Sequence, residues 1–299
     1  MRRLSRVSWL ALALALSLSG SLFAQTQITT GVIQGVVEDA SGAVVPAAQI
    51  AVKNVDTNFG RELTTGTDGR FVFLQLAPGR YQVTVSKEGF ATLVQEGVVV
   101  SVGQTVTLSP SLKVSDVAET VTVTGTATVD TTRTESSSTL NETTIATTPI
   151  LGRKFEDLLT LTPGVSVVQG PDGDEITFAG QRGVFNNISL DGGDYNNGFF
   201  GEQMGGQRAA IDITLEAVKE FQVVATGAGA EFGRTAGGVV NVITKSGTND
   251  LHGSLFHFQR LEGLTSEASD GSKLEDFHRE QFGGTLGGPI QKDKAFFFL

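Results

Sequence analysis

The side chains that most often perform catalysis or bind metals are few in this chain, and they are not spaced for either task. The three histidines are His252, His257 and His278, and none begins an H-x-x-E or H-E-x-x-H pattern. Zinc peptidases need such spacing to bring two ligands to one metal ion. The chain has no cysteine, which excludes thiolate chemistry. We therefore predict no catalytic residue, no metal ligand and no cofactor, and we do not expect an enzyme.

Three further segments contain residue types that could bind ions or nucleotides. Residues 172–175 (DGDE) and 191–197 (DGGDYNN) offer oxygen ligands, but neither has the EF-hand spacing with its closing Glu. Turn formation explains Asp, Gly and Asn equally well. Residues 227–233 (GAGAEFG) lack the spacing of a dinucleotide-binding loop and the Gly-Lys of a P-loop. Turns and close backbone packing are the better interpretation of all three.

The N-terminus has the pattern of a secretory signal peptide. Three arginines within the first six residues precede the apolar run Trp9–Leu18, which is well short of the ~20 residues that a membrane-spanning helix needs. A membrane anchor is the alternative. We expect residues 1–24 to be removed by cleavage after Ala24, with export by the general route.

Composition narrows the class of protein further. The formal net charge is −10 and the pI is about 4.8, which argues against nucleic acid as a partner, because that binding depends on Lys and Arg at the phosphates. An exported chain without cysteine has no disulfides, so sheets and apolar burial must stabilise it. The 37 glycines, with abundant Thr and Val, favour a β-rich chain of a bacterial envelope with many tight turns.

Residues 31–113 predict a small β-sandwich. Short alternating segments are separated by Gly, Asp and Pro about every ten residues, the spacing of a sandwich with one core. The segments 35–39 (GVVED), 67–71 (TDGRF) and 76–81 (LAPGRY) resemble the carboxypeptidase regulatory-like domain, which is a transthyretin-like sandwich. The resemblance is to a non-catalytic module and not to a peptidase.

Residues 114–144 are rich in Thr and Ser without a sustained hydrophobic period, which predicts a linker. Inside it, an acidic residue is followed by alternating Thr and Val. A strand flanked by flexible chain offers backbone groups that a partner's sheet can bind. The pattern resembles the TonB box of TonB-dependent outer-membrane receptors, which implies that TonB pairs with Glu119, Thr120, Val121, Thr122 and Val123. The alternatives are the last strand of the sandwich and a plain linker.

Residues 145–250 resemble the plug domain of the same receptors. A short amphipathic helix is predicted over 153–161, because apolar residues recur at helical spacing before a Pro-Gly pair. A second helix is expected over 212–221, followed by a strand. Residues 179–192 (AGQRGVFNNISLDG) resemble the plug core, in which an Arg-Gly turn precedes a strand that ends in Asp-Gly. The resemblance implies a core that contains Arg182, Gly183, Asp191 and Gly192.

We expect Arg182 to pair with a carboxylate of a surrounding barrel wall, because an unpaired buried charge is costly. A solvated turn residue is the alternative for this position.

Residues 251–299 predict the first strands of a membrane β-barrel. Up to three strands are expected, at 253–260, 281–286 and 294–299, with Phe256 and Phe258 on one face of the first and His257 and Gln259 on the other. One face would meet lipid and the other the lumen. So few strands cannot close a barrel, and an open edge in hydrocarbon is costly. We therefore expect an N-terminal fragment of a longer protein.

The segments 149–153, 161–165 and 281–290 (QFGGTLGGPI) resemble the Oar-like branch of the TonB-dependent receptors. Leu151 departs from the Asn that is common there, which puts only a local turn in doubt.

The resemblance implies a mainly β chain with a transthyretin-like sandwich, an α+β plug and an incomplete outer-membrane barrel. It implies energy-coupled uptake of an extracellular ligand that the sequence does not identify, with TonB and outer-membrane lipid as partners and the N-terminal domain in the periplasm. The alternative is a secreted carbohydrate-binding or adhesion protein built on the sandwich.

Overall fold

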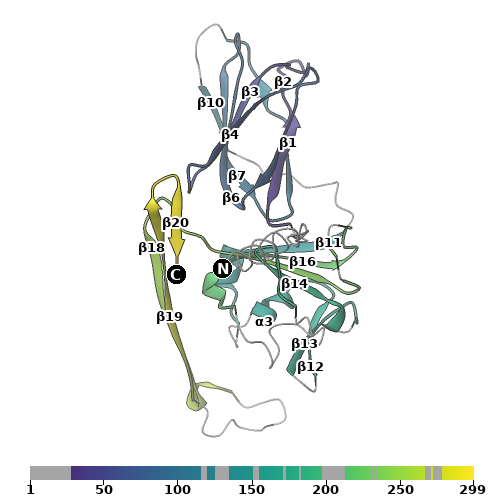
Figure 1. Ribbon diagram of the computed structural model, residues 1–299, viewed down its shortest axis with the longest axis vertical. Helices are drawn as coiled ribbons and strands as arrows, with labels where there is room; N and C mark the ends of the chain where they lie inside the picture. Colours follow the sequence, from purple (N-terminus) through teal and green to yellow (C-terminus); the bar gives the residue numbers. More distant parts are fainter. Residues whose placement is uncertain are drawn as a thin grey trace, which may run out of the picture.

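The computed structural model (Figure 1) shows three β-rich parts: a sandwich, a mixed sheet with short helices, and a long hairpin beside that sheet. The predicted signal peptide, Glu119 and Arg182 lie outside the residues that the structure describes. Those residues are 28–115, 120–124, 135–150, 155–170, 173–181, 183–196, 213–230, 232–233, 235–266, 271 and 278–299.

The first part confirms the predicted β-sandwich. One sheet has the strand order β5-β1-β8 and the other the order β10-β7-β6-β3-β4. The bounds are β1 Gly31–Val36, β3 Gln49–Asn54, β4 Gly60–Thr64, β5 Arg70–Leu76, β6 Gly79–Ser86, β7 Thr92–Val100, β8 Thr105–Leu108 and β10 Thr120–Thr124, with a small ladder of β2 Glu38–Asp39 and β9 Ser111–Leu112.

The core of the sandwich follows from the period of two along its strands, because successive side chains point to opposite faces. In β5, Phe71 and Phe73 are buried while Val72 and Leu74 are exposed. In β6, Tyr81 is fully buried, and its hydroxyl donates to the Ala77 carbonyl at 2.8 Å. These aromatic side chains and Ile33 belong to one hydrophobic cluster.

The second part is a five-stranded sheet of order β11-β16-β17-β14-β15, with a separate β12-β13 hairpin. Phe155, Leu158, Phe178 and Phe221 are among its buried core residues. The bounds are β11 Ser136–Asn141, α2 Glu142–Thr147, α3 Phe155–Leu159, β12 Val165–Gly170, β13 Gly173–Phe178, η1 Gly183–Phe185, β14 Asn187–Leu190, β15 Gly193–Asp194, η2 Leu215–Ala217, β16 Val218–Thr226 and β17 Val239–Thr244.

The helix expected over 212–221 is wrong in its extent. The structure has only the 3-10 turn η2 there, and β16 begins at Val218. The reason is tertiary: β16 lies between β11 and β17 and is buried on both faces, so its apolar residues do not alternate and resemble a helical pattern. The predicted linker 114–144 holds β10 and β11 and the start of α2.

The third part is an antiparallel sheet of β18 His252–Leu261, β19 His278–Gln291 and β20 Ala295–Phe298. These are the three strands expected at the start of a barrel. Figure 1 shows the β18–β19 hairpin running along the side of the second part. In the described part of the chain, no helix is long and apolar enough to cross a membrane.

Gly35 in β1 allows the closest backbone approach inside the sandwich. A Cβ atom at this position would lie 1.9 Å from the Leu108 carbonyl oxygen and 2.9 Å from the Phe71 ring. Both neighbours are parts of the packed sheet, so a side chain here must displace backbone.

We predict that Gly35→Ala destabilises the sandwich by about 1–3 kcal/mol, the usual cost of overpacking a core. The measurement is urea unfolding of residues 28–115, followed by circular dichroism. Gly60→Ala is the matched control, because a Cβ there would meet only the Val52 carbonyl oxygen at 3.6 Å. Equal stability of the two variants would contradict the packing explanation.

Candidate functional site

Four of the five predicted TonB-box residues, Thr120–Val123, lie in the edge strand β10 of the sandwich. Thr120–Thr124 pairs in parallel with Thr92–Glu96 of β7, and Thr122 lies opposite Val94. Val121 is partly buried against the sandwich core, whereas 44% of Val123 is exposed. The segment is therefore held by the sandwich, as in the alternative of a last sandwich strand.

The pairing of β10 leaves one of its two edges open. The strand order places β10 at the end of the five-stranded sheet, and within the described residues no strand pairs with its outer side. Such an edge offers unpaired N–H and C=O groups to an incoming strand. The chemistry available here is β-augmentation, which is compatible with a role in binding an extended partner.

The predicted plug-core residues lie at two places in the second part. Gly183 begins η1, while Asp191 and Gly192 form the left-handed turn after β14, with φ of 49° and 80°. Asp191 accepts from the Thr244 backbone N–H at 2.9 Å and from the Thr244 hydroxyl at 2.7 Å. The Asp-Gly pair thus joins the β14–β15 turn to the end of β17.

Replacing Asp191 should weaken this junction. Asp191→Ala removes both acceptors and places a residue less tolerant of positive φ in the turn, so we predict a loss of roughly 1–2 kcal/mol in unfolding free energy. Asp191→Asn is the matched control, because Asn tolerates the left-handed region and keeps one acceptor. Urea unfolding of residues 25–250 measures both, and an equal loss in the two variants would show that this acceptor geometry is unimportant.

A buried polar network beside this turn was missed by the sequence analysis. Asn241 is fully buried in β17, where it accepts from the Ser189 hydroxyl at 2.8 Å and donates to the Ile28 carbonyl. Asn186 donates to the Ile176 carbonyl at 2.6 Å and accepts from Gly238 N–H at 3.1 Å. The sequence feature that could have indicated this network is the occurrence of Asn within runs of apolar residues. A polar side chain buried in such a run needs hydrogen-bond partners.

The sandwich and the second part meet at the start of β16. Glu220, only 5% exposed, accepts a 2.5 Å hydrogen bond from the Val102 N–H just beyond β7. Lys219 donates to the Pro78 carbonyl at 2.5 Å. Burial raises the pKa of Glu220, while the Val102 N–H, the Lys219 charge and Ser101 act in the opposite direction. The junction therefore contains a carboxyl group that burial disfavours in its charged form.

A pH dependence follows from the raised pKa of Glu220. The folded state binds this proton more tightly than the unfolded state, so its contribution to stability falls as pH rises from about 4.5, the ordinary value, through the raised pKa. We predict that Glu220→Gln, which keeps an oxygen acceptor for Val102, removes this fall. Urea unfolding of residues 25–250 from pH 4 to pH 8 compares the two chains, and identical pH profiles would contradict the prediction.

A second contact joins the sandwich to the turn between β19 and β20. Asp293 in that turn accepts from Asn58 at 2.7 Å and from Asn249 at 2.8 Å, and its own N–H donates to Asn249 at 2.8 Å. These two amide donors, first Asn58 and then Asn249, lower the pKa of Asp293. Asn249 N–H also donates to the Asp56 carbonyl at 3.0 Å. We call these four residues the rim clasp.

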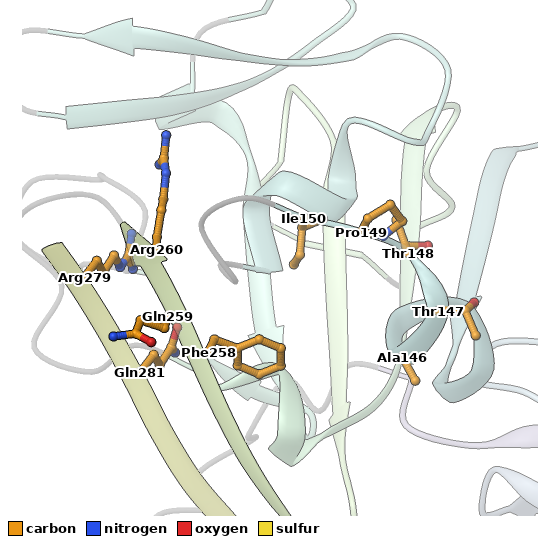
Figure 2. A pocket seen from close by; sticks show the side chains of 10 residues that line it. All are labelled: Ala146, Thr147, Thr148, Pro149, Ile150, Phe258, Gln259, Arg260, Arg279 and Gln281. Atoms are coloured by element: carbon orange, nitrogen blue, oxygen red, sulfur yellow. The ribbon is translucent and has the colours of Figure 1, made fainter. Parts of the chain in front are cut away.

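The β18–β19 hairpin has two distinct faces. Phe258 lies opposite Gln281 and Arg260 opposite Arg279 in the register. These four residues, with Gln259 and residues 146–150, line an open cavity of about 630 Å³ between the hairpin and the α2 region (Figure 2). The aromatic face is thus turned toward the second part. Alternation of Phe256 and Phe258 against His257 and Gln259 agrees with the sequence prediction.

The opposite face of the hairpin is apolar and exposed. Leu255 is 94% exposed, Phe282 76%, Leu286 45% and Ile290 73%. Gln259, Glu280 and His278 form a hydrogen-bonded polar group at one end of this face. An exposed apolar band that ends in polar residues is typical of a strand wall that meets lipid.

Comparison with known proteins gives three family matches along the chain. Residues 32–113 match the carboxypeptidase regulatory-like domain, residues 130–240 the TonB-dependent receptor plug domain, and residues 243–299 an outer membrane beta barrel domain.

The chain spans less than a third of the length of the curated relatives that it matches. The chain is 29% identical over its whole length to the "TonB-dependent transporter Oar" of Myxococcus xanthus, of which it spans 28%. Over 82 residues the chain is 39% identical to a "Probable TonB-dependent siderophore receptor PirA" of Acinetobacter baumannii. These residues are 27% of the chain and 10% of that relative. The crystal structure of the siderophore receptor PirA from Acinetobacter baumannii superposes with a TM-score of 0.41 and 24% sequence identity. The superposition covers 53% of this chain and 23% of the PirA chain.

Proposed function

We propose that this chain, which belongs to the TonB-dependent receptors, acts as part of an outer-membrane transporter that takes up an extracellular ligand with energy delivered through TonB. The observation that carries the proposal is the order of three matched domains: regulatory-like sandwich, plug and first barrel strands. The long relative is a transporter of the same class. A secreted carbohydrate-binding or adhesion protein does not account for the plug and barrel matches.

The hairpin supports a position in the outer membrane. On β19 the apolar residues of the outer face run from Phe282 to Ile290, a length of about 27 Å at ~3.4 Å per residue. This is close to the roughly 25 Å apolar band of outer-membrane barrels. The other face contacts the plug side. In this arrangement lipid covers the outer face, and the sandwich lies in the periplasm beneath the plug.

The proposed mechanism is gated uptake. Ligand bound outside shifts the plug, TonB pairs with the box residues, and a pull from the inner membrane opens a path through the barrel. Thr120, Val121, Thr122 and Val123 of β10 would provide the backbone groups for pairing, with Glu119 preceding them. Arg182, which lies outside the described residues, would serve as a plug residue that pairs with a wall carboxylate.

Val121→Pro tests the box assignment. Proline removes a backbone donor and is not tolerated inside a paired strand, so we predict that binding to the TonB C-terminal domain is abolished. Binding is measured by titrating the purified full-length receptor in detergent with that domain.

Thr128→Pro is the control, because it adds a proline four residues beyond β10 without changing Thr120–Thr124. It should bind TonB as the parent does. Unchanged affinity of Val121→Pro would remove the box from these residues.

A further inference from the structure

The parallel pairing of β10 with β7 decides how a partner strand can reach the box. We propose that TonB binds to the sandwich sheet as a whole: β10 stays on β7, and a strand of the TonB periplasmic domain adds to the outer edge of β10. The five-stranded sheet thereby becomes six-stranded. This inference rests on the proposed function and specifies the surface that the partner recognises.

The first support is that β10 is already extended and aligned. Five residue pairs join it to β7, from Thr120 opposite Thr92 to Thr124 opposite Glu96. Val121 anchors it to the sandwich core. Because the backbone of β10 is ordered before the partner binds, binding at this edge avoids the conformational entropy cost of ordering a flexible segment. Displacing β10 would instead break the existing ladder.

The second support is a difference between the two edges of the same sheet. β10 has no charged residue and no proline, and Thr120 and Thr122 are exposed. The opposite edge strand, β4, carries Arg61 and Glu62, and Arg61 donates to the Leu74 carbonyl at 2.6 Å. Charges and cross-contacts are how proteins protect edges from strand addition. Among the described residues, the edge of β4 has this protection and the edge of β10 does not.

The third support is a short route from β10 to the plug. β7 pairs with β10 and ends at Val100, and two residues later the Val102 N–H binds Glu220 of β16. Lys219 holds the neighbouring turn at Pro78. A pull applied to β10 therefore reaches the central plug strand through the sheet, in addition to the chain that connects β10 to β11. On this view the sandwich transmits force.

A disulfide staple tests whether β10 must leave β7. Residues 1–299 contain no cysteine, so Thr122→Cys with Val94→Cys introduces a single defined pair within this part of the receptor. These two positions are register partners on adjacent strands, and neighbouring strands lie about 4.8 Å apart, within the range that a disulfide spans. We expect the oxidised full-length receptor to bind the TonB periplasmic domain with a Kd within about twofold of the reduced form.

The control staple is Ala51→Cys with Thr84→Cys, which joins β3 to β6 away from β10. Binding at least tenfold weaker in the oxidised Thr122–Val94 variant alone would overturn the proposal, because β10 would then have to separate from β7; the box assignment would still hold. Loss of binding in the reduced variants and in the parent chain would reject the box itself, and with it the proposed function.

Amide hydrogen exchange on the unmodified receptor provides a second measurement. With TonB bound, the Thr92–Glu96 amides of β7 should exchange at rates within about twofold of those without TonB. Exchange at least tenfold faster in the complex would show that the β10–β7 ladder opens and would also overturn the proposal.

Discussion

The hydrogen bond between Glu220 and the Val102 N–H is the contact on which the relation between sandwich and plug depends. It lies between the end of β7 in the sandwich and the beginning of β16 in the plug sheet. Both residues are almost completely buried. A carboxylate removed from water is costly unless it is hydrogen-bonded. The Val102 N–H provides that hydrogen bond for Glu220.

Two further hydrogen bonds also hold the sandwich against the plug. Lys219 binds a carbonyl of the β5–β6 turn, and Ile28, just before β1, is held by Asn241 in the plug sheet. The sandwich is thus attached by both its N-terminal segment and its turns. Such a junction favours a fixed geometry over a loose tether, because a shift of one domain on the other would leave these polar groups buried without partners.

The fold class of each domain could be predicted from the sequence. The contacts between strands and between domains could not. Alternation in Phe71-Val72-Phe73 predicts a half-buried strand because one face meets a core and the other water. β16 does not follow that rule, because Val223 and Val224, which lie on opposite faces of this interior strand, are both buried. The partner of β10 could not be inferred either, because five alternating Thr and Val residues do not specify which sheet accepts them. Glu220 and Asn241 are visible in the sequence, but the Val102 N–H that donates to Glu220 and the Ile28 carbonyl that accepts from Asn241 lie more than a hundred residues away.

The rim clasp limits rotation of the sandwich relative to the β18–β19–β20 sheet. Asn58 on the sandwich and Asp293 on the first wall turn share one hydrogen bond, and Asn249, where the plug passes into the wall, binds the same carboxylate. A sandwich held at this point cannot turn freely around the first strands of the wall. A molecule that docked on the sandwich would therefore meet the plug and these strands in one fixed orientation.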